Sequence, residues 1–290
     1  MCNVFRNIKW KHRSQHGSHG AISRMIPRFT ILLLLFVYLA GQINNKVILH
    51  HAHAHNDYNN KKPLLSAIEH GFKSIEVDIL LSNGKLFVGH GFLDIMKGQM
   101  LEDLYLKPLY KIFSENQGFI YDKEIPLYLL VDIKSSAEQT FYKLDTLLMD
   151  YIPMLTKVEL GKVISGAVTI ILSGNKPNID ILKNMKERYV FIDGRIDDVG
   201  KNISNNIIPL ISVNWSDKFE WKGKRDISEK ELNNLKSIVK NVHNEGKQLR
   251  FWGSPDNEKT WQILYLSGID LINTDKIEKF YDYFVKDSNN

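Results

Sequence analysis

The 290-residue sequence predicts a single (β/α)8 TIM barrel, an α/β fold in which eight parallel strands close on themselves. Short apolar, β-rich runs alternate with segments of helical periodicity, and this alternation is typical of a parallel sheet. Eight such runs favour a closed barrel over an open sheet. The composition, 43% hydrophobic and 24% charged, is ordinary for a globular domain. We therefore expect one barrel domain over residues 43–286.

Each predicted strand is an apolar run that ends in polar residues. The eight are Lys46–Leu49, Ser74–Leu80, Leu127–Asp132, Val168–Leu172, Val190–Asp193, Leu210–Val213, Gln248–Trp252 and Leu271–Asn273. The predicted helices have apolar residues at helical spacing, and several carry caps. They are Pro63–His70, Ala137–Leu148, Ile179–Arg188, Ser228–Glu245, Lys259–Ser267 and Ile277–Val285. We expect the long segment Phe92–Ile125 to cover the barrel mouth and residues 287–290 to fray.

Residues 1–42 are predicted to be a basic leader. They hold six of the 38 Lys and Arg residues and no Asp or Glu, so the rest of the chain has 32 basic against 33 acidic residues. The net charge of +5 therefore belongs to the leader, and no surface for nucleic acid is implied. The apolar run Phe29–Ala40 is short for a spanning helix and suits a signal peptide, with an uncleaved membrane anchor as the alternative. We expect an exported, periplasmic or secreted, monomer without disulfides, because the single cysteine is Cys2.

Glu76 and Asp78 lie two residues apart in the predicted strand Ser74–Leu80, so both side chains belong to one face of it. Buried carboxylates need a cation or a basic partner. A hard divalent ion such as Mg²⁺ or Ca²⁺, which prefers oxygen ligands, would satisfy both. The alternative is a pair of structural ion pairs.

Asp132 and Lys134 repeat this pattern at the end of the next predicted strand. Adjacent parallel strands lie about 4.8 Å apart, so Asp132 can join the two acids as a third metal ligand. Lys134 can then meet an anionic substrate. The alternative is that Asp132 and Lys134 only pair with each other.

Histidines gather before and after this strand. His51, His53 and His55 alternate with alanines and are predicted to share one face, and His90 follows the next turn on the same rim. Two imidazoles on either side of a phosphorus atom can act as base and acid near neutral pH.

Two later residues fall at predicted strand ends. Arg195 could place its guanidinium beside a phosphate or form a structural pair. Trp252 could stack on a substrate or pack in the core.

Several motifs together, in this order and spacing, resemble the phosphatidylinositol-phospholipase-C-like phosphodiesterase superfamily, which includes glycerophosphodiester phosphodiesterases and sphingomyelinase D. These motifs are His53-Ala54-His55, Glu76-x-Asp78, His90, Asp132-x-Lys134 and Asn273-Thr274-Asp275. The HAHNDY form most resembles a bacterial and fungal branch of the superfamily. The likeness extends from about His51 to Asp275.

The resemblance implies a TIM-barrel hydrolase with one divalent metal and two catalytic histidines. The metal ligands carry over to Glu76, Asp78 and Asp132. The histidines carry over to His90 and to either His53 or His55, between which the motif does not choose. From the strand ends and the motifs together, the candidate substrate-binding residues are Lys134, Arg195, Trp252 and Asn273.

The implied substrate is a small phosphodiester such as a glycerophosphodiester or a (lyso)phospholipid head group, and contact with a membrane surface is compatible with the latter. The chain lacks the His-Arg-Gly and Pro-Glu-Asn motifs usual in glycerophosphodiester enzymes, so fold and metal centre are better supported than substrate. An amidohydrolase-type metallo-hydrolase also begins with His-x-His but needs more histidines on middle strands, and after His90 only His243 remains. A catalytically inactive, exported binding barrel is the other alternative.

Overall fold

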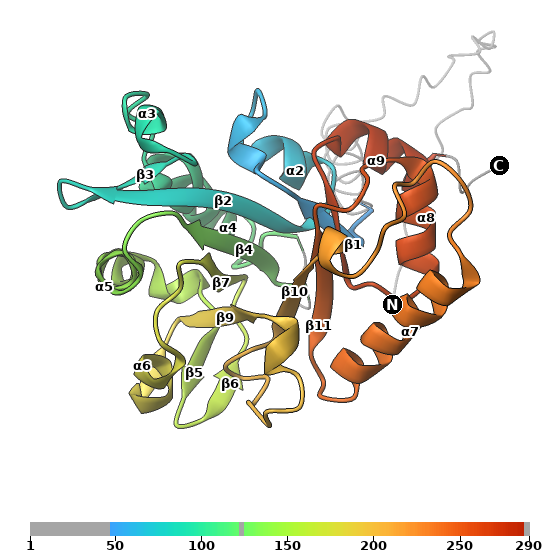
Figure 1. Cartoon of the computed structure of the whole chain (residues 1–290). Coiled ribbons are helices and arrows are strands. Elements are labelled where there is room, and N and C mark those ends of the chain that lie inside the picture. The colour runs from blue at the N-terminus through green and yellow to red at the C-terminus, as the bar shows by residue number, and fades with distance from the viewer. Residues whose placement is uncertain (1–46, 122–124, 287–290) are drawn as a thin grey trace, which may run out of the picture. The chain divides into compact units, whose positions relative to one another are not determined.

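The computed structural model describes residues 47–121 and 125–286. In this part of the chain, eight parallel strands pair in the order β1-β12-β11-β10-β9-β7-β4-β2, and β2 pairs with β1 to close a barrel (Figure 1). The strands are β1 (Leu49–Ala54), β2 (Phe72–Ser82), β4 (Leu127–Ile133), β7 (Val168–Gly174), β9 (Val190–Gly194), β10 (Leu210–Asn214), β11 (Gln248–Trp252) and β12 (Leu271–Thr274). The predicted fold class is confirmed. The predicted leader and residues 287–290 lie outside the described residues.

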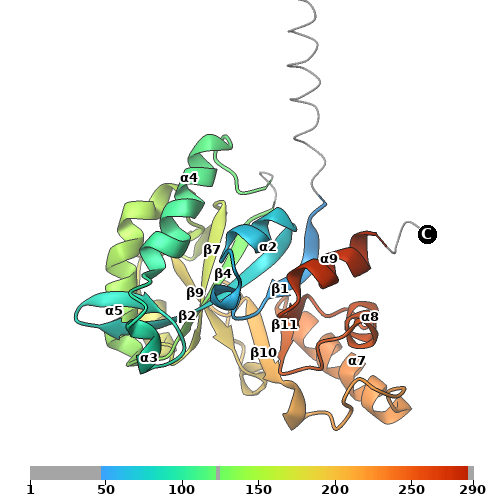
Figure 2. The same cartoon turned by 90° about the horizontal axis from the view of Figure 1, so that it is seen from above.

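Helices surround the barrel (Figures 1 and 2). The longer ones are α2 (Leu65–Glu69), α4 (Lys107–Glu115), α5 (Ala137–Leu148), α6 (Ile179–Asn184), α7 (Glu229–His243), α8 (Glu258–Leu266) and α9 (Ile277–Val285). Short turns of helix are η1 (Asp57–Asn59), α3 (Phe92–Ile95), η2 (Glu102–Leu106), η3 (Met149–Met154), η4 (Ile196–Asp198) and η5 (Trp215–Asp217). At the start of α7 the hydroxyl of Ser228 accepts the Glu231 amide at 3.2 Å, as the predicted cap requires. Among the described residues, no helix has the length and apolarity needed to cross a bilayer.

Four further strands stand outside the barrel ring. β3 (Lys85–Val88) folds back on β2 as an antiparallel hairpin. β5 (Lys157–Glu159), β6 (Lys162–Ile164) and β8 (Glu187–Arg188) form a separate small sheet. The predicted helix Ile179–Arg188 therefore ends early, at Asn184, because its last two residues pair with β5.

The barrel interior has an apolar part and a polar part. Apolar side chains from five barrel strands and β5 form a small buried cluster: Leu130, Val158, Ile171, Phe191, Leu210 and Leu271. Further along the same strands, in the direction of their carboxyl ends, the inward positions are polar, for example Asp132 after Leu130 and Ser173 after Ile171. The apolar cluster thus closes the barrel beneath a polar layer, and a larger core fills the space between strands and helices.

The first strand lies further along the chain than predicted. It is Leu49–Ala54 rather than Lys46–Leu49, so His51 and His53 are within the strand. The register of β1 against β2 shifts between Leu49 and His53, and this irregularity breaks the alternation of side chains. The ring of His51 packs outward against three aromatic rings of α8 and α9, with centroids 4.4 to 5.8 Å away. The expectation that all three histidines share a face is therefore wrong for His51.

The segment Phe92–Ile125 does not cover the barrel mouth as a whole. Its central part forms η2 and α4, in the crossover between β3 and β4, and the Tyr105, Leu106 and Leu109 side chains there are fully buried. This part belongs to the outer helical layer. The short helix α3, which begins two residues after His90, lies at the rim beside this histidine.

Asp57 fixes the loop that follows β1 and carries His55. Its carboxylate is fully buried and accepts the amide of Leu64 at 2.5 Å and the hydroxyl of Tyr105 at 2.8 Å. Leu64 has a φ of 64°, which is unfavourable for a residue with a side chain. The hydrogen bond to Asp57 helps to hold this strained backbone, so the loop has a defined position.

Replacing Asp57 by alanine should leave two buried donors, on Leu64 and Tyr105, without an acceptor. We expect the free energy of unfolding, measured by urea denaturation, to fall by about 2–4 kcal/mol. The control is Asp103→Ala, an exposed acid on η2, which should change stability by no more than about 0.5 kcal/mol. Equal stability of the two variants would contradict this role for Asp57.

Candidate active site

A cavity of about 520 Å³ opens where the barrel strands end. Seven predicted site residues line it: His55, Glu76, His90, Asp132, Lys134, Arg195 and Trp252. The strand order brings them together, because the carboxyl ends of all parallel strands lie at the same end of a barrel. The sequence motifs therefore converge on one site.

Three carboxylates meet at this rim. β2 and β4 pair in register, with Asp78 opposite Asp132 and Glu76 opposite Leu130, so the three acids point into the barrel from neighbouring strands. One oxygen of each lies within 4.8 Å of the others. This acidic triad is the one the sequence predicted, and it could hold a metal ion.

The chemistry of the triad fits an oxygen-preferring cation. Asp78 Oδ2 accepts the Tyr58 hydroxyl at 2.9 Å, and Asp132 Oδ2 lies 3.0 Å from Lys134 Nζ. The other oxygen of each aspartate, Oδ1, is buried and has no hydrogen-bond partner within the described residues. Burial raises the pKa of Asp132, and the nearby Lys134 offsets this only in part. Two buried carboxylate oxygens without donors are what a hard divalent cation would coordinate.

Gly174, the last residue of β7, leaves room for Asp132. Its φ is +66°, and a Cβ added there would lie 2.0 Å from Asp132 Oδ1 and 2.6 Å from the Ile133 carbonyl oxygen. Any side chain at this position would push the Asp132 carboxylate out of place. The close approach of β7 to β4 at the rim thus depends on glycine.

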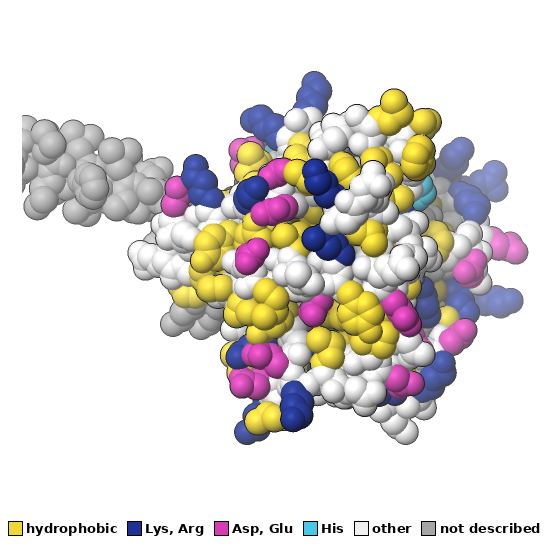
Figure 3. Space-filling view, turned by 90° about the vertical axis from the view of Figure 1, so that its left-hand side faces the viewer, with side chains coloured by type: hydrophobic (Ala, Val, Ile, Leu, Met, Phe, Trp, Pro, Cys, Tyr) yellow, Lys and Arg dark blue, Asp and Glu magenta, His cyan; other side chains and the backbone are white. Residues whose placement is uncertain are grey.

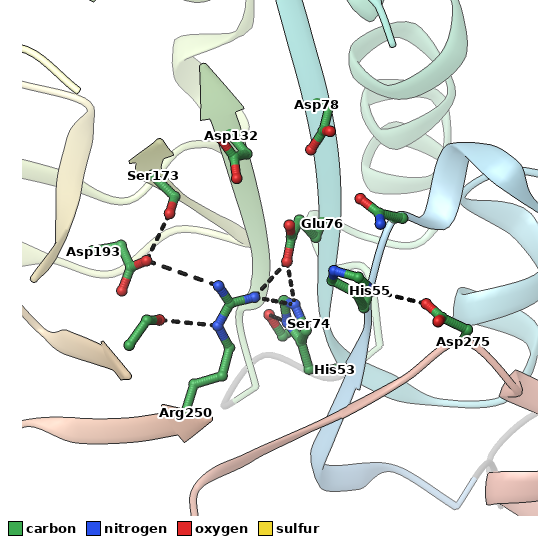
Figure 4. A network of polar contacts seen from close by, with 12 residues as sticks. His53, His55, Ser74, Glu76, Asp78, Asp132, Ser173, Asp193, Arg250 and Asp275 are labelled. Carbon is green, nitrogen blue, oxygen red and sulfur yellow. Dashed lines mark hydrogen bonds and ion pairs between the residues drawn. The ribbon is translucent and has the colours of Figure 1, made fainter. Parts of the chain in front are cut away.

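Arg250 lies under the triad in the middle of the barrel (Figure 4). Its guanidinium binds Glu76 Oε2, approaches Asp193 to 3.9 Å and donates to the Ser212 hydroxyl at 2.9 Å. Burial by itself would raise the pKa of Glu76, but Arg250 and His53 hold it well below its usual range. Glu76 is therefore ionised, and Arg250 balances its charge.

His53 is enclosed in this network. It is fully buried, its Nδ1 lies 2.8 Å from the Ser74 hydroxyl, and its Nε2 lies 2.8 Å from Glu76 and 2.7 Å from Arg250. Burial and the neighbouring guanidinium lower the pKa of His53 to about 4. Both ring nitrogens are occupied, and the ring does not line the cavity.

His55 differs from His53 in each of these respects. It lines the cavity, and its Nδ1 is held 2.8 Å from Asp275 Oδ1 (Figure 4). This leaves Nε2 as the nitrogen that can act on a bound molecule. Burial alone would lower the pKa of His55, but the hydrogen bond to Asp275 and the charge of Glu76 raise it.

His90, in the loop after β3, is held in the same manner. Its Nδ1 lies 2.8 Å from Asp78 Oδ2, and its side chain is 71% exposed and lines the cavity. One histidine just after β1 and one after the β2–β3 hairpin therefore line the same cavity as Glu76 and Asp132, each with one nitrogen bound to a carboxylate.

The predicted substrate-binding residues divide into two groups. Lys134, Arg195 and Trp252 line the cavity, and Arg195 also pairs with the buried Asp193 at 3.1 Å. Asn273 does not line it: this residue is 6% exposed and lies beside His53 in the barrel, one layer below the rim. Asp275, two residues later, takes the rim position.

Two residues of the site were missed at the sequence level. Arg250 could have been found from its place in Gln248–Trp252, where an arginine alternates with apolar residues and must face the barrel interior. Asp275 was in the motif Asn273-Thr274-Asp275, but its partner His55 is 220 residues away and only the closure of β12 on β1 joins them.

Replacing Gly174 by alanine should displace the Asp132 carboxylate and weaken metal binding. We expect the affinity for Mg²⁺ or Ca²⁺, measured by isothermal titration calorimetry, to fall about 10–100-fold. The matched control is Gly200→Ala, because Gly200 also has a positive φ, of 88°, but nothing lies within 4 Å of an added Cβ. Equal affinity of both variants would show that Asp132 is not a ligand.

The chain is similar in sequence to known proteins. Residues 41–193 match the AIM6-like phosphodiesterase domain. The chain is 29% identical over 269 residues to altered inheritance of mitochondria protein 6 of Eremothecium gossypii, covering 80% of this chain and 68% of the relative. A homolog in Arthroderma benhamiae is 24% identical over 262 residues, covering 80% of this chain and 83% of the relative.

The fold also matches a solved structure. A glycerophosphodiester phosphodiesterase from Parabacteroides distasonis superposes with a TM-score of 0.50 at 14% identity, covering 83% of this chain and 98% of that one. At this identity the likeness concerns the fold. The superfamily resemblance stated from the motifs is confirmed, and the chain belongs to the family of the AIM6-like phosphodiesterase domain.

Proposed function

We propose that this protein is a metal-dependent phosphodiesterase that uses His55 and His90 as its acid-base pair. The observation that carries the proposal is that three carboxylates lie within 4.8 Å of one another at a cavity lined by His55 and His90, and that two of them, Asp78 and Asp132, have a buried oxygen without a partner in the described part of the chain. Each of the two histidines has one nitrogen tied to a carboxylate. Membership in the AIM6-like phosphodiesterase domain family supports the class of reaction.

Glu76, Asp78 and Asp132 would hold the cation. Carboxylate oxygens favour a hard divalent ion, and we propose Mg²⁺ or Ca²⁺. When bound, such an ion supplies positive charge that stabilises the non-bridging oxygens of a phosphodiester. Within the part of the chain that the structure describes, the candidate metal ligands are three carboxylates, and two histidines line the cavity. This arrangement offers no support for an amidohydrolase-type centre.

Lys134 would bind the phosphate beside the triad. Its ammonium lies 3.0 Å from Asp132 and 3.4 Å from Asp78, and these carboxylates raise its pKa although burial opposes this. The side chain is therefore a fixed cation facing the cavity. A cation held ready in this position needs no reorganisation when negative charge develops on the phosphoryl group.

The two histidines would transfer the protons. The free Nε2 of one ring accepts the proton of the attacking hydroxyl group, from water or from the substrate itself, and the other ring donates a proton to the leaving oxygen. Asp275 and Asp78 fix the orientation of His55 and His90 respectively. His53, which the motif alone could not distinguish from His55, would act indirectly by positioning Glu76.

The substrate would be a glycerophosphodiester or a (lyso)phospholipid head group. The half-exposed Trp252 and the guanidinium of Arg195 also line the cavity, and a polar head group with an anionic or hydroxyl group could bind beside them. A solved structure with the same fold is a glycerophosphodiester phosphodiesterase, which is consistent with such a substrate.

Removing either catalytic histidine should abolish most of the activity without removing the metal site. We expect His55→Ala and His90→Ala to lower the rate of Mg²⁺- or Ca²⁺-dependent hydrolysis of bis(p-nitrophenyl) phosphate by about 10²-fold or more each. His243→Ala is the control, because His243 pairs with Asp270 at 2.8 Å outside the cavity. Undiminished turnover by either alanine variant would refute the assignment, and no turnover by the wild type with either ion would favour an inactive binding barrel.

The pH dependence should report the His55–Asp275 pair. Asp275 raises the pKa of His55, so Asp275→Asn should lower it, and the limb of the pH–rate profile that His55 controls should move to lower pH. If the acidic limb moves, His55 is the base, and if the alkaline limb moves, it is the acid. A variant with a lower rate but with both limbs in place would mean that Asp275 does not tune His55.

A further inference from the structure

An apolar cluster is exposed directly beside the cavity. Phe92, Leu93 and Met96 on the short helix α3 are 76, 77 and 80% exposed. Figure 3 shows apolar side chains gathered over α3 at the upper right of this face. α3 begins two residues after His90, so the cluster borders the rim on the side of this histidine.

The outward position of this cluster is built into the local structure. Asp94 turns inward, and its Oδ2 accepts the amides of His90 at 2.9 Å and Gly91 at 3.1 Å. Gly89, with a φ of 147°, lets the Asp94 side chain pack against the backbone, since an added Cβ would lie 2.1 Å from the Asp94 Cβ. Because Asp94 is fixed inward, the neighbouring apolar side chains of the one-turn helix are presented to solvent.

We propose that α3 docks on the surface of a phospholipid bilayer, inserting Phe92, Leu93 and Met96 among the lipids so that the cavity faces a membrane-borne phosphodiester. This inference deepens the proposed phosphodiesterase function and rests on it, because it names the lipid surface as the source of the substrate. The lipid phosphate would then be presented next to His90.

The size and charge of the cluster favour lipid over a protein partner. Three side chains of this kind cover roughly 500 Å², less than the ~800 Å² per partner of a standard protein interface. Insertion of a few apolar side chains is, in contrast, enough for reversible binding at a membrane surface. The surrounding segment 82–100 has Lys85 and Lys97 against Asp94 as its only acid, and Asp94 binds backbone amides and also pairs with Lys97 at 2.7 Å, so the segment keeps a net charge of +1. The segment therefore suits anionic head groups.

Insertion at α3 can be measured with a fluorophore placed at residue 92. The chain has one cysteine, Cys2, so Phe92→Cys in a Cys2→Ser background of the full chain carries a single site for an environment-sensitive NBD label. The local readout matters because the apolar run 29–40 could hold the chain on vesicles by itself. Leu160→Cys with the same label is the control, because Leu160 is 81% exposed on the turn between β5 and β6.

With vesicles of phosphatidylcholine and phosphatidylserine, we expect a blue shift of emission and quenching by spin labels on the lipid tails at position 92, and neither at position 160. The absence of both signals at 92, or equal signals at the two positions, would overturn the proposal. A blue shift at 92 that grows with protein concentration without vesicles would assign the cluster to a second copy of the chain and overturn it as well.

A kinetic comparison tests the link to the cavity. The triple variant Phe92→Ser, Leu93→Ser, Met96→Ser should hydrolyse lysophospholipid in vesicles at least about tenfold more slowly, while its rate on soluble bis(p-nitrophenyl) phosphate stays unchanged. The control triple variant, Leu160→Ser, Val163→Ser and Leu266→Ser, removes apolar side chains that are 52 to 81% exposed elsewhere, and it should keep both rates. An equal loss in both triple variants would count against α3. Lack of any phosphodiesterase activity would refute the proposed function, whereas the labelling result would still decide the lipid docking.

Discussion

The site depends on negative charge that is buried at the end of the barrel. Glu76, Asp78 and Asp132 come from two neighbouring strands that pair in register, and a buried carboxylate is costly without a compensating charge. Two cations are shared among the acids: Arg250 lies between Glu76 and Asp193, and Lys134 lies between Asp78 and Asp132. Because each cation is shared between two carboxylates, some buried carboxylate oxygens at the rim have no partner among the described residues. A bound divalent cation would complete the balance.

The rest of the barrel places these charges. An apolar cluster closes the interior below, so that Arg250 and the acids above it form a defined layer in place of a water-filled channel. The rim is shaped by local features of the backbone. Gly174 lets β7 approach Asp132, and the buried Asp57 fixes the loop after β1. Closure of β12 on β1 brings Asp275 to His55.

The fold and the acidic triad could be predicted from the sequence because both follow from periodicity. Strand alternation put Glu76 and Asp78 on one face, and the parallel pairing of neighbouring strands placed Asp132 beside them. The histidines were harder to place, because an irregular register in β1 turns His51 outward and moves the strand boundary. Arg250 is one of the groups that enclose His53, and it is 197 residues away in the sequence. The local sequence pattern therefore could not show which of His53 and His55 faces the cavity.

Periodicity also could not predict the place of Asn273 or the exposure of the apolar side chains at α3, for two different reasons. The motif pointed to Asn273, but strand ends are uncertain by a residue or two, and the rim position belongs to Asp275. Phe92, Leu93 and Met96 face outward because hydrogen bonds fix the Asp94 side chain inward. The spacing of apolar residues along a helix or strand does not predict such a local hydrogen bond.

The central claim, that the three carboxylates hold one divalent cation between two histidines, can be tested directly by diffraction. A crystal soaked in Mn²⁺, which shares the preference of Mg²⁺ for oxygen ligands, would be measured at the manganese absorption edge. The account predicts one anomalous peak within coordination distance of Glu76, Asp78 and Asp132, with the rings of His55 and His90 on either side of it. A peak located elsewhere, or a well-ordered triad with no peak, would contradict it.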